Sequence, residues 1–416
     1  MTGLRACGLA ACAALAVCAA LATPACTRSD SGPRTYKPYT GPPVYPERRA
    51  PLPPVEGDLG LVSNAGSDTV TAIDIARGEV LATLPVGRDP VDLDGPHHIA
   101  LDRVRGFAYV ALSYPATAAA SGPHASHGGS ARLGVVQKLR LSDLRVVGEA
   151  RVDPNPGDIV LSDDGRRLVV THFDLTRATA KGLEPAARRA TLAVLDPETL
   201  SLTGSPEPVK VPVCAAPHGL ALSRPGGDLA FVACYGDDAI AVLDLRDPAA
   251  APVRVPLGPA AQSAPSAPVY GPYSAALSPS GRELLVADLD SKDLRVVDVA
   301  TRAPTGLVFP TQGAPYFPAW SEDGAELFVP TQAPDGVRVL DARTGAVKRQ
   351  RAFDPSECMS PHEAVLGADA TAVWVVCEGD RKKPSVVLSL DRATLATRRS
   401  VGVGVYPDRL IVRGPK

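Results

Sequence analysis

The hexapeptide PHGLAL, residues 217–222, decides the fold because related versions of it stand at seven places in the chain. Each version opens with a proline and continues into apolar residues: PHHIAL at 96–101, PGDIVL at 156–161, PHGLAL at 217–222, PYSAAL at 272–277, PYFPAW at 315–320, PHEAVL at 361–366 and PDRLIV at 407–412. Neighbouring prolines are 43 to 61 residues apart. Short strands that return every 40 to 50 residues or so are typical of β-propeller blades. The repeat therefore predicts an all-β chain folded as a seven-bladed β-propeller.

The first and last units of this repeat are incomplete in complementary ways. The first unit begins at a second-strand motif, Leu61–Asn64, with no proline strand before it. The last proline strand, residues 407–412, has no further strands after it. Pairing the C-terminal strand with the N-terminal unit completes the seventh blade. Such closure removes the open sheet edges that a linear array would expose.

One unit also resembles a known family of repeats. Asn64–Asp74 (NAGSDTVTAID), followed by Gly78–Val80 and Pro85–Gly87, resembles the YVTN-type propeller repeat of YncE-like bacterial proteins. The resemblance extends over essentially all of residues 58–416, which we take as the propeller domain. It implies the fold but selects no function, because such blades serve binding, scaffolding and catalysis alike.

The N-terminal residues 1–26 have the pattern of an export signal. Arg5 precedes an apolar run from Ala6 to Ala22, and small residues lead to Cys26. This resembles a bacterial lipoprotein signal in which Cys26 becomes the lipidated N-terminus, although Thr23 stands where that pattern has Leu. An ordinary secretory signal cut near Ala25 is the alternative.

Residues 27–57 are rich in proline and charge and are expected to form a disordered tether between the lipid and the propeller. Thr27, rather than Asp, after the lipidated cysteine implies sorting to the outer membrane by analogy with Gram-negative lipoproteins. The expected location is therefore extracytoplasmic, with the membrane as a partner through the lipid anchor.

Composition narrows the range of partners. The formal net charge is −2 and the pI is about 6.4, so no basic field is present to attract nucleic acid. Another envelope protein or a small molecule remains as a candidate partner, and we expect a monomer.

The cysteines of the propeller stand at matched positions. Cys214 and Cys358 each precede a repeat proline by three residues, and Cys234 and Cys377 each end a second strand. This matching predicts two disulfides within blades, Cys214–Cys234 and Cys358–Cys377, formed outside the cytoplasm. A four-thiolate metal site is the rival interpretation, but the chain has no C-x-x-C pair to support it.

The first residue after each repeat proline is expected near one mouth of the central channel. These residues, with the neighbouring His98, give the binding candidates His97, His98, His218, Tyr273, Tyr316, His362 and Asp408. Imidazoles near carboxylate and phenol groups can bind a transition metal, and His97, His218 and His362 are the predicted ligands of a divalent ion. The alternative is that these histidines only form hydrogen bonds between blades.

No catalytic motif accompanies the repeat. The chain lacks a G-x-S-x-G nucleophile elbow, an H-E-x-x-H zinc motif and a phosphate-binding loop. The sequence therefore favours a non-enzymatic, membrane-tethered binding or assembly scaffold. The alternative is an extracytoplasmic metal-dependent oxidoreductase or lactonase-like hydrolase that uses the channel mouth.

Overall fold

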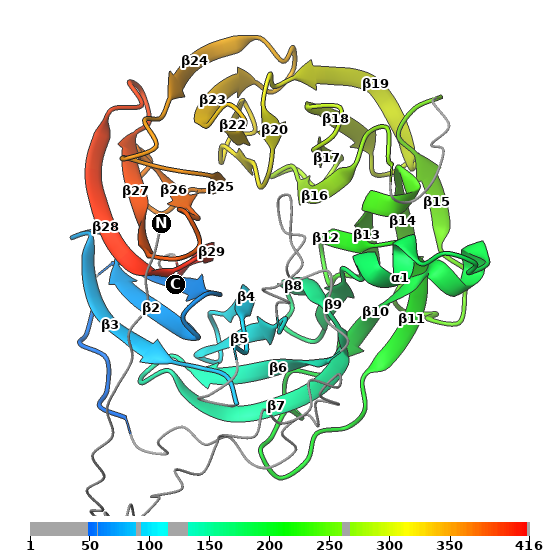
Figure 1. Cartoon of the computed structure of the whole chain (residues 1–416), viewed down its shortest axis with the longest axis horizontal. Coiled ribbons are helices and arrows are strands. Elements are labelled where there is room, and N and C mark those ends of the chain that lie inside the picture. The colour runs from blue at the N-terminus through cyan, green and yellow to red at the C-terminus, as the bar shows by residue number, and fades with distance from the viewer. Residues whose placement is uncertain (1–48, 56, 89–92, 115–131, 260–266, 414–416) are drawn as a thin grey trace, which may run out of the picture. The chain divides into compact units, whose positions relative to one another are not determined.

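The computed structural model describes residues 49–55, 57–88, 93–114, 132–259 and 267–413. The predicted signal peptide, the lipidation site Cys26 and most of the predicted tether lie outside these residues. In the described part, strands dominate and form seven antiparallel sheets arranged as the blades of a ring (Figure 1). The predicted seven-bladed β-propeller is confirmed.

Each blade contains an inner strand that opens at a repeat proline, and three strands that follow outwards. In order from the centre, the first four blades are β29 (Pro407–Arg413), β1 (Leu59–Asn64), β2 (Thr69–Asp74) and β3 (Glu79–Pro85); β4 (Pro96–Asp102), β5 (Phe107–Leu112), β6 (Leu133–Arg140) and β7 (Arg145–Pro154); β8 (Pro156–Leu161), β9 (Leu168–His172), β10 (Ala190–Leu195) and β11 (Val209–Cys214); and β12 (Pro217–Leu222), β13 (Leu229–Cys234), β14 (Ala239–Asp244) and β15 (Val253–Pro256).

The remaining three blades follow the same plan. They are β16 (Pro272–Leu277), β17 (Glu283–Asp288), β18 (Asp293–Asp298) and β19 (Ala303–Pro310); β20 (Ala314–Pro315) with β21 (Ala319–Trp320), then β22 (Glu326–Gln332), β23 (Gly336–Asp341) and β24 (Val347–Ala352); and β25 (Pro361–Val365), β26 (Ala372–Cys377), β27 (Pro384–Asp391) and β28 (Thr397–Val405). The inner strand of blade six is interrupted at residues 316–318, between β20 and β21.

The ring closes as the complementary end units predict. The C-terminal strand β29 pairs antiparallel with β1, from Leu59 opposite Arg413 to Asn64 opposite Pro407. The blade that contains both ends of the domain is therefore built from the two termini (Figure 1). This pairing places Asp408 in the centre of the ring beside residues that precede it by hundreds of positions.

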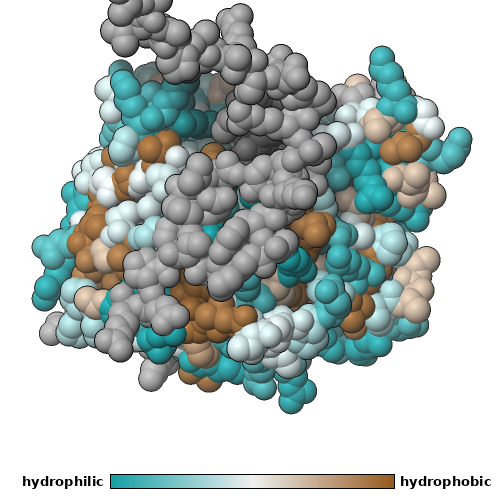
Figure 2. Space-filling view, turned by 60° about the horizontal axis from the view of Figure 1, so that its bottom comes forward, coloured by the Kyte–Doolittle hydropathy of each residue, from teal (hydrophilic) through white to brown (hydrophobic). Residues whose placement is uncertain are grey.

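The core lies between neighbouring blades. Second strands such as β26, with the sequence AVWVVC, are buried at every position because adjacent blades cover both faces. Outer strands such as β19 and β24 are largely exposed. On the face shown in Figure 2, hydrophobic residues form small separate groups among hydrophilic ones. Among the described residues, the helical ones lie in α1 (Leu175–Thr179), η2 (Pro185–Arg188) and η3 (Tyr235–Asp237).

Both predicted disulfide pairs are present, but one of them joins two blades. Cys214 and Cys234 lie 5.9 Å apart between Cα atoms, and Cys358 and Cys377 lie 5.3 Å apart. Cys214 is the last residue of β11 in blade three, whereas Cys234 ends β13 in blade four. The expected placement within one blade is wrong for this pair, because the chain enters the next blade only at Pro217. The pairs are typical of proteins that fold outside the cytoplasm.

The last part of the predicted tether packs against the propeller. The Arg49 guanidinium donates to the Leu144 carbonyl at 2.7 Å, and the Leu52 amide donates to the Ser142 carbonyl at 2.7 Å. Leu52 and Val55 also pack on the core between blades one and two. The described end of this segment is therefore part of the domain, because its apolar side chains find an apolar surface. Among the described residues, no helix is long and apolar enough to cross a bilayer.

Candidate metal centre

A β-bulge at the start of most inner strands directs the residue after the repeat proline. The ladder between first and second strands shifts register there in six blades: at residues 97–98, 157–158, 218–219, 273, 362 and 408. A bulge bends the strand and changes where its side chain points. The residue before the proline has positive φ in the same six blades: Gly95, Asn155, Ala216, Gly271, Ser360 and Tyr406. The local backbone thus repeats together with the side chains that it positions.

All of the predicted binding residues lie inside the ring and are buried. His97, His98, His218, His362, Tyr316 and Asp408 have no exposed surface, and Tyr273 has 1 %. They fill the centre at the end of the inner strands where the prolines stand, rather than lining an open mouth. Their chemistry is therefore set by one another and by the groups packed around them.

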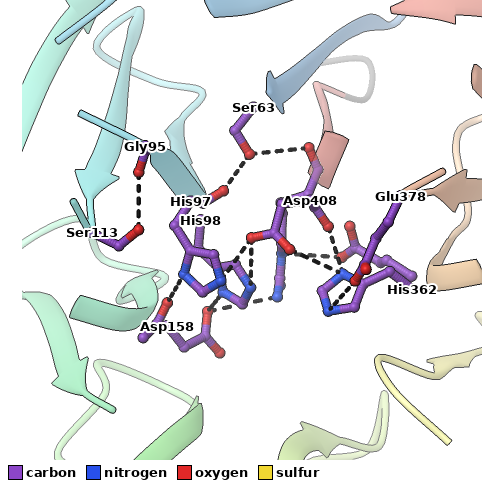
Figure 3. Close-up of polar contacts among 12 residues, drawn as sticks. Ser63, Gly95, His97, His98, Ser113, Asp158, His362, Glu378 and Asp408 are labelled. Carbon is purple, nitrogen blue, oxygen red and sulfur yellow. Dashed lines mark hydrogen bonds and ion pairs between the residues drawn. The ribbon is translucent and has the colours of Figure 1, made fainter. Parts of the chain in front are cut away.

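The first group of convergent ligand atoms contains His97, His98 and Asp408. Their ligand atoms all lie within 4.8 Å of one another, as Figure 3 shows around the Asp408 carboxylate. Nε2 of His97 is 2.7 Å from Asp408 Oδ2, and Nε2 of His98 is 3.8 Å from the same oxygen. The two imidazoles stack with ring centroids 4.2 Å apart. Two consecutive residues thus present one nitrogen each to a single carboxylate.

A second group, on the other side of Asp408, contains His362 and Glu378. Its three ligand atoms also lie within 4.8 Å of one another. Nδ1 of His362 is 3.6 Å from Asp408 Oδ1, and Nε2 of His362 is 3.8 Å from Glu378 Oε1 (Figure 3). Asp408 belongs to both groups, which makes it the central anion of the site.

The Nδ1 atoms of three histidines are each fixed by an acceptor. Nδ1 of His97 is 2.7 Å from the Gly157 carbonyl, and Nδ1 of His98 is 2.7 Å from Asp158 Oδ1. Nδ1 of His362 is 2.6 Å from the Asp408 carbonyl. Histidines that bind metals usually donate their second N–H to a carbonyl or carboxylate in this way, which leaves the Nε2 lone pair for the ion.

Acceptors on both sides of an imidazole also create a demand for positive charge. A neutral imidazole has one N–H, so a ring between two acceptors can satisfy only one of them. His97 stands between the Gly157 carbonyl and the Asp408 carboxylate, each at 2.7 Å. Burial holds the pKa of His98 well below its usual value, and the neighbouring His97 adds to this effect. His98 is therefore neutral. Because its Nδ1 faces Asp158 Oδ1 at 2.7 Å, its Nε2 lone pair is directed towards Asp408.

His218 and the two tyrosines form an aromatic wall next to these groups. His218 stacks on Tyr273 with ring centroids 3.8 Å apart. It makes an edge-to-face contact with His98, and the centroids of these two rings are 5.6 Å apart. Tyr316 lies 5.3 Å from His362. Burial raises the pKa of Tyr273 and Tyr316 well above the usual value, so both phenols are neutral. Among the described residues, His218 is in neither ligand group, and the predicted trio of His97, His218 and His362 does not converge as one set.

Sequence reasoning missed a layer of charged residues around the ligands. Asp158, Glu363 and Arg409 are the second residues after their repeat prolines, one position beyond the predicted set. Arg409 lies between the other two, with Nε 3.0 Å from Glu363 Oε1 and Nη1 3.6 Å from Asp158 Oδ1. Its guanidinium also covers the Phe317 ring at 4.8 Å. The signal for them is the second position after the repeat proline, which holds His98, Asp158, Glu363 and Arg409 in four of the blades.

Burial changes the protonation of two of these carboxyl groups. Burial raises the pKa of Glu363 to about 7, although Arg409 opposes the shift. It also raises the pKa of Asp158, again against the effect of Arg409. With Asp408 and Glu378, this centre contains four carboxyl groups but two guanidinium groups, Arg409 and Arg381, the latter 2.6 Å from Glu378. Full ionisation of the four carboxyl groups with neutral imidazoles would give a formal charge of −2, and protonation of Glu363, whose pKa is about 7, reduces this negative charge near neutral pH.

Comparison with known proteins supports the fold. No protein-family model matches the chain, and the comparison with curated proteins found no match. Solved structures that are similar include a protein of unknown function from Desulfotomaculum acetoxidans, with 12% identity and a TM-score of 0.62 over 86% of this chain and 99% of that one. The periplasmic gluconolactonase PpgL of Pseudomonas aeruginosa has 18% identity and a TM-score of 0.60, over 85% of this chain and 99% of its own.

A third similar structure is AztD of Citrobacter koseri, with 13% identity and a TM-score of 0.54 over 86% of this chain and 98% of AztD. At these identities the likeness shows the propeller fold alone.

Proposed function

We propose that this protein is an extracytoplasmic binding protein that holds a divalent transition-metal ion at the centre of its propeller. The observation that carries the proposal is the convergence of His97 Nε2, His98 Nε2 and the Asp408 carboxylate within 4.8 Å. His362 and Glu378 form a second group of the same kind with the shared Asp408. Mixed imidazole and carboxylate donors suit zinc, copper and nickel rather than calcium or magnesium.

The distances fit this chemistry with a small adjustment. Two ligand atoms that are each about 2.1 Å from one tetrahedral ion are separated by about 3.4 Å. The 3.8 Å between His98 Nε2 and Asp408 Oδ2 is close to this value, and the 2.7 Å between His97 Nε2 and the same oxygen is shorter. Admitting an ion therefore requires the Asp408 carboxylate to move away from His97 by roughly half an ångström or more.

A binding role is favoured over catalysis because the proposed ligands are closed off from solvent. His97, His98, His362, Glu378 and Asp408 are each 0% exposed. A catalytic metal keeps one coordination position open to water or substrate, whereas structural sites are closed. The oxidoreductase and lactonase-like alternatives would require a whole substrate molecule to reach these buried atoms, whereas metal binding requires the entry of an ion alone.

The cellular setting is part of the same proposal. The two disulfides support an oxidising compartment. A lipid anchor on Cys26 and sorting to the outer membrane would keep the propeller at an envelope surface, where a second envelope protein could exchange metal with it. Mass spectrometry of the native N-terminus should then find acylated Cys26 with no residues before it. A chain that begins at Met1 or Thr27 would refute the anchor.

Metal content tests the proposed site directly. Untagged protein from the periplasm, analysed by inductively coupled plasma mass spectrometry and titrated with ZnCl₂ or CuCl₂ after EDTA treatment, should bind close to one ion per chain. His98→Gln should abolish high-affinity binding. His172→Gln is the matched control, because His172 is equally buried but its Nδ1 faces the Thr191 carbonyl, away from the ligand groups.

A variant at His218 distinguishes two possible ligand sets: the groups around Asp408 seen in the structure, and the trio of His97, His218 and His362 predicted from sequence. His218→Phe preserves a ring that can stack on Tyr273, and it should retain the metal because His218 is outside both groups. Loss of metal from a folded His218→Phe protein would favour the trio predicted from sequence. Equal metal content in wild type, His98→Gln and a Asp408→Asn variant would refute the proposed function.

A further inference from the structure

The central channel is filled at one end and hollow at the other. Beyond the bulges, the inner strands of five blades surround a cavity of about 720 Å³. Its walls include apolar residues near the ends of these strands, among them Val160, Leu222, Ala276 and Ile411, and the turns that follow add charged groups. This cavity lies away from the proline ends of the inner strands, and it takes no part in the proposed metal coordination.

The same strands are packed very differently along their length. In β8 and β16, the first three residues are buried, whereas the last two are partly exposed: Val160 and Leu161 in β8, Ala276 and Leu277 in β16. Large side chains fill the centre of the ring at the proline ends of the inner strands. Small alanine side chains, such as Ala276, recur towards the opposite ends of these strands. The chain thus leaves apolar surface accessible in its centre, and covering that surface with an apolar ligand is favourable.

The charged groups of the cavity wall differ in the hydrogen bonds and ion pairs that they form within the protein. Asp102 accepts from the Arg105 guanidinium at 2.9 Å, and Asp163 accepts from the Gly226 amide at 2.6 Å. Asp164 accepts from the Ser162 hydroxyl at 2.7 Å. These carboxylates therefore have partners within the turns. Four arginines, Arg103, Arg105, Arg224 and Arg409, line the cavity against three aspartates, Asp102, Asp163 and Asp164.

Arg409 is the arginine best placed to receive a ligand. It comes from β29 at the centre of the ring, and its side chain keeps 18% of its surface exposed. Phe317 and the carboxylates of Glu363 and Asp158 hold the guanidinium in place. Nε and Nη1 of this guanidinium are buried against Glu363 and Asp158, so the N–H groups of Nη2 are the donors left to receive a ligand carboxylate.

We propose that this cavity is a second binding site, distinct from the metal centre, for a small organic anion with an apolar body and one carboxylate. The carboxylate contacts Arg409, and the apolar body covers Val160, Leu222 and Ala276. A cavity of this volume, with mainly apolar walls and a few fixed polar groups, is typical of small-molecule sites.

Binding of octanoate to the full-length metal-loaded protein tests this site by isothermal titration calorimetry. Octanamide is the matched neutral probe, because it keeps the apolar chain and removes the charge. We expect octanoate to bind at least tenfold more tightly than octanamide in the wild type. Arg409→Gln should remove this preference, and Ala276→Phe should weaken both probes by filling the cavity. Arg246→Gln, at an exposed arginine paired with Asp244 outside the cavity, should bind like the wild type.

The two proposals can fail separately. Ala276→Phe leaves the metal ligands untouched, so its metal content should equal that of the wild type even if Arg409→Gln disturbs the centre. Equal affinity for octanoate and octanamide, or unchanged octanoate binding in a folded Ala276→Phe protein, would overturn the anion site. Neither result would bear on the metal centre, whose readout is metal content alone.

Discussion

Replacing Asp158 by asparagine should weaken metal binding without removing a ligand. Asp158 Oδ1 is 2.7 Å from His98 Nδ1 and accepts from the Ile159 amide at 2.9 Å, while Oδ2 accepts from the Leu220 amide at 3.0 Å. Asparagine has nearly the same shape but one acceptor oxygen instead of two. In the variant, either His98 or Leu220 faces an NH₂ group, and the negative charge behind His98 is gone.

The size of the effect follows from the role of this carboxylate. Groups that orient a ligating histidine typically contribute 10- to 100-fold to metal affinity. We therefore expect the zinc dissociation constant of Asp158→Asn to rise by about 10- to 100-fold, which corresponds to about 1.4 to 2.7 kcal/mol. His98→Gln should have a larger effect, because it removes the ligand itself.

Competition with a fluorescent zinc chelator at neutral pH measures this difference, with circular dichroism as a check on folding. Asp153→Asn is the matched control, since Asp153 pairs with Lys210 at 2.7 Å and Thr191 at 2.6 Å, away from the centre. An Asp158→Asn protein that is folded and binds zinc within twofold of the wild type would refute the assigned role of the carboxylate. It would also weaken the argument that His98 is held in position to coordinate metal.

Two further predictions concern stability. Removing the Cys358–Cys377 disulfide as the double serine variant releases a loop with a sequence separation of 19 residues, and urea unfolding should show a loss of about 3 kcal/mol; an unchanged unfolding midpoint would contradict this. Burial raises the pKa of Glu363 from 4.5 to about 7, so its contribution to stability is fully present below pH 4.5 and is lost as pH rises through about 7. The free energy of unfolding of Glu363→Gln, taken relative to that of the wild type, should therefore rise by about 3 kcal/mol between pH 4 and pH 8. Both proteins are measured after EDTA treatment. A difference between them that stays constant across this range would show that Glu363 has an ordinary pKa.

The sequence by itself determined the architecture of this protein. Seven proline-led strands, with incomplete units at Leu61–Asn64 and residues 407–412, were sufficient to predict the blades and their closure. The reason is that each blade is a local unit in which strands that follow one another in the chain also pair. The cysteine pairs were also predictable, because matched positions in repeated units become matched positions in space. The blade of Cys214 was not, since the repeat does not show where one blade ends and the next begins.

The tertiary structure alone decided which side chains meet in the centre. His97, His362 and Asp408 come from three different blades, and the repeat places them at equal positions without showing which ones converge. Bulges turn these side chains towards the centre of the ring. The rings of Phe317, His218 and Tyr273 pack beside them and divide the centre unequally among the blades. The layer of Asp158, Glu363 and Arg409 and the cavity beyond it depend on the same packing. Such contacts join residues far apart in the sequence, and their geometry follows from how the whole ring closes.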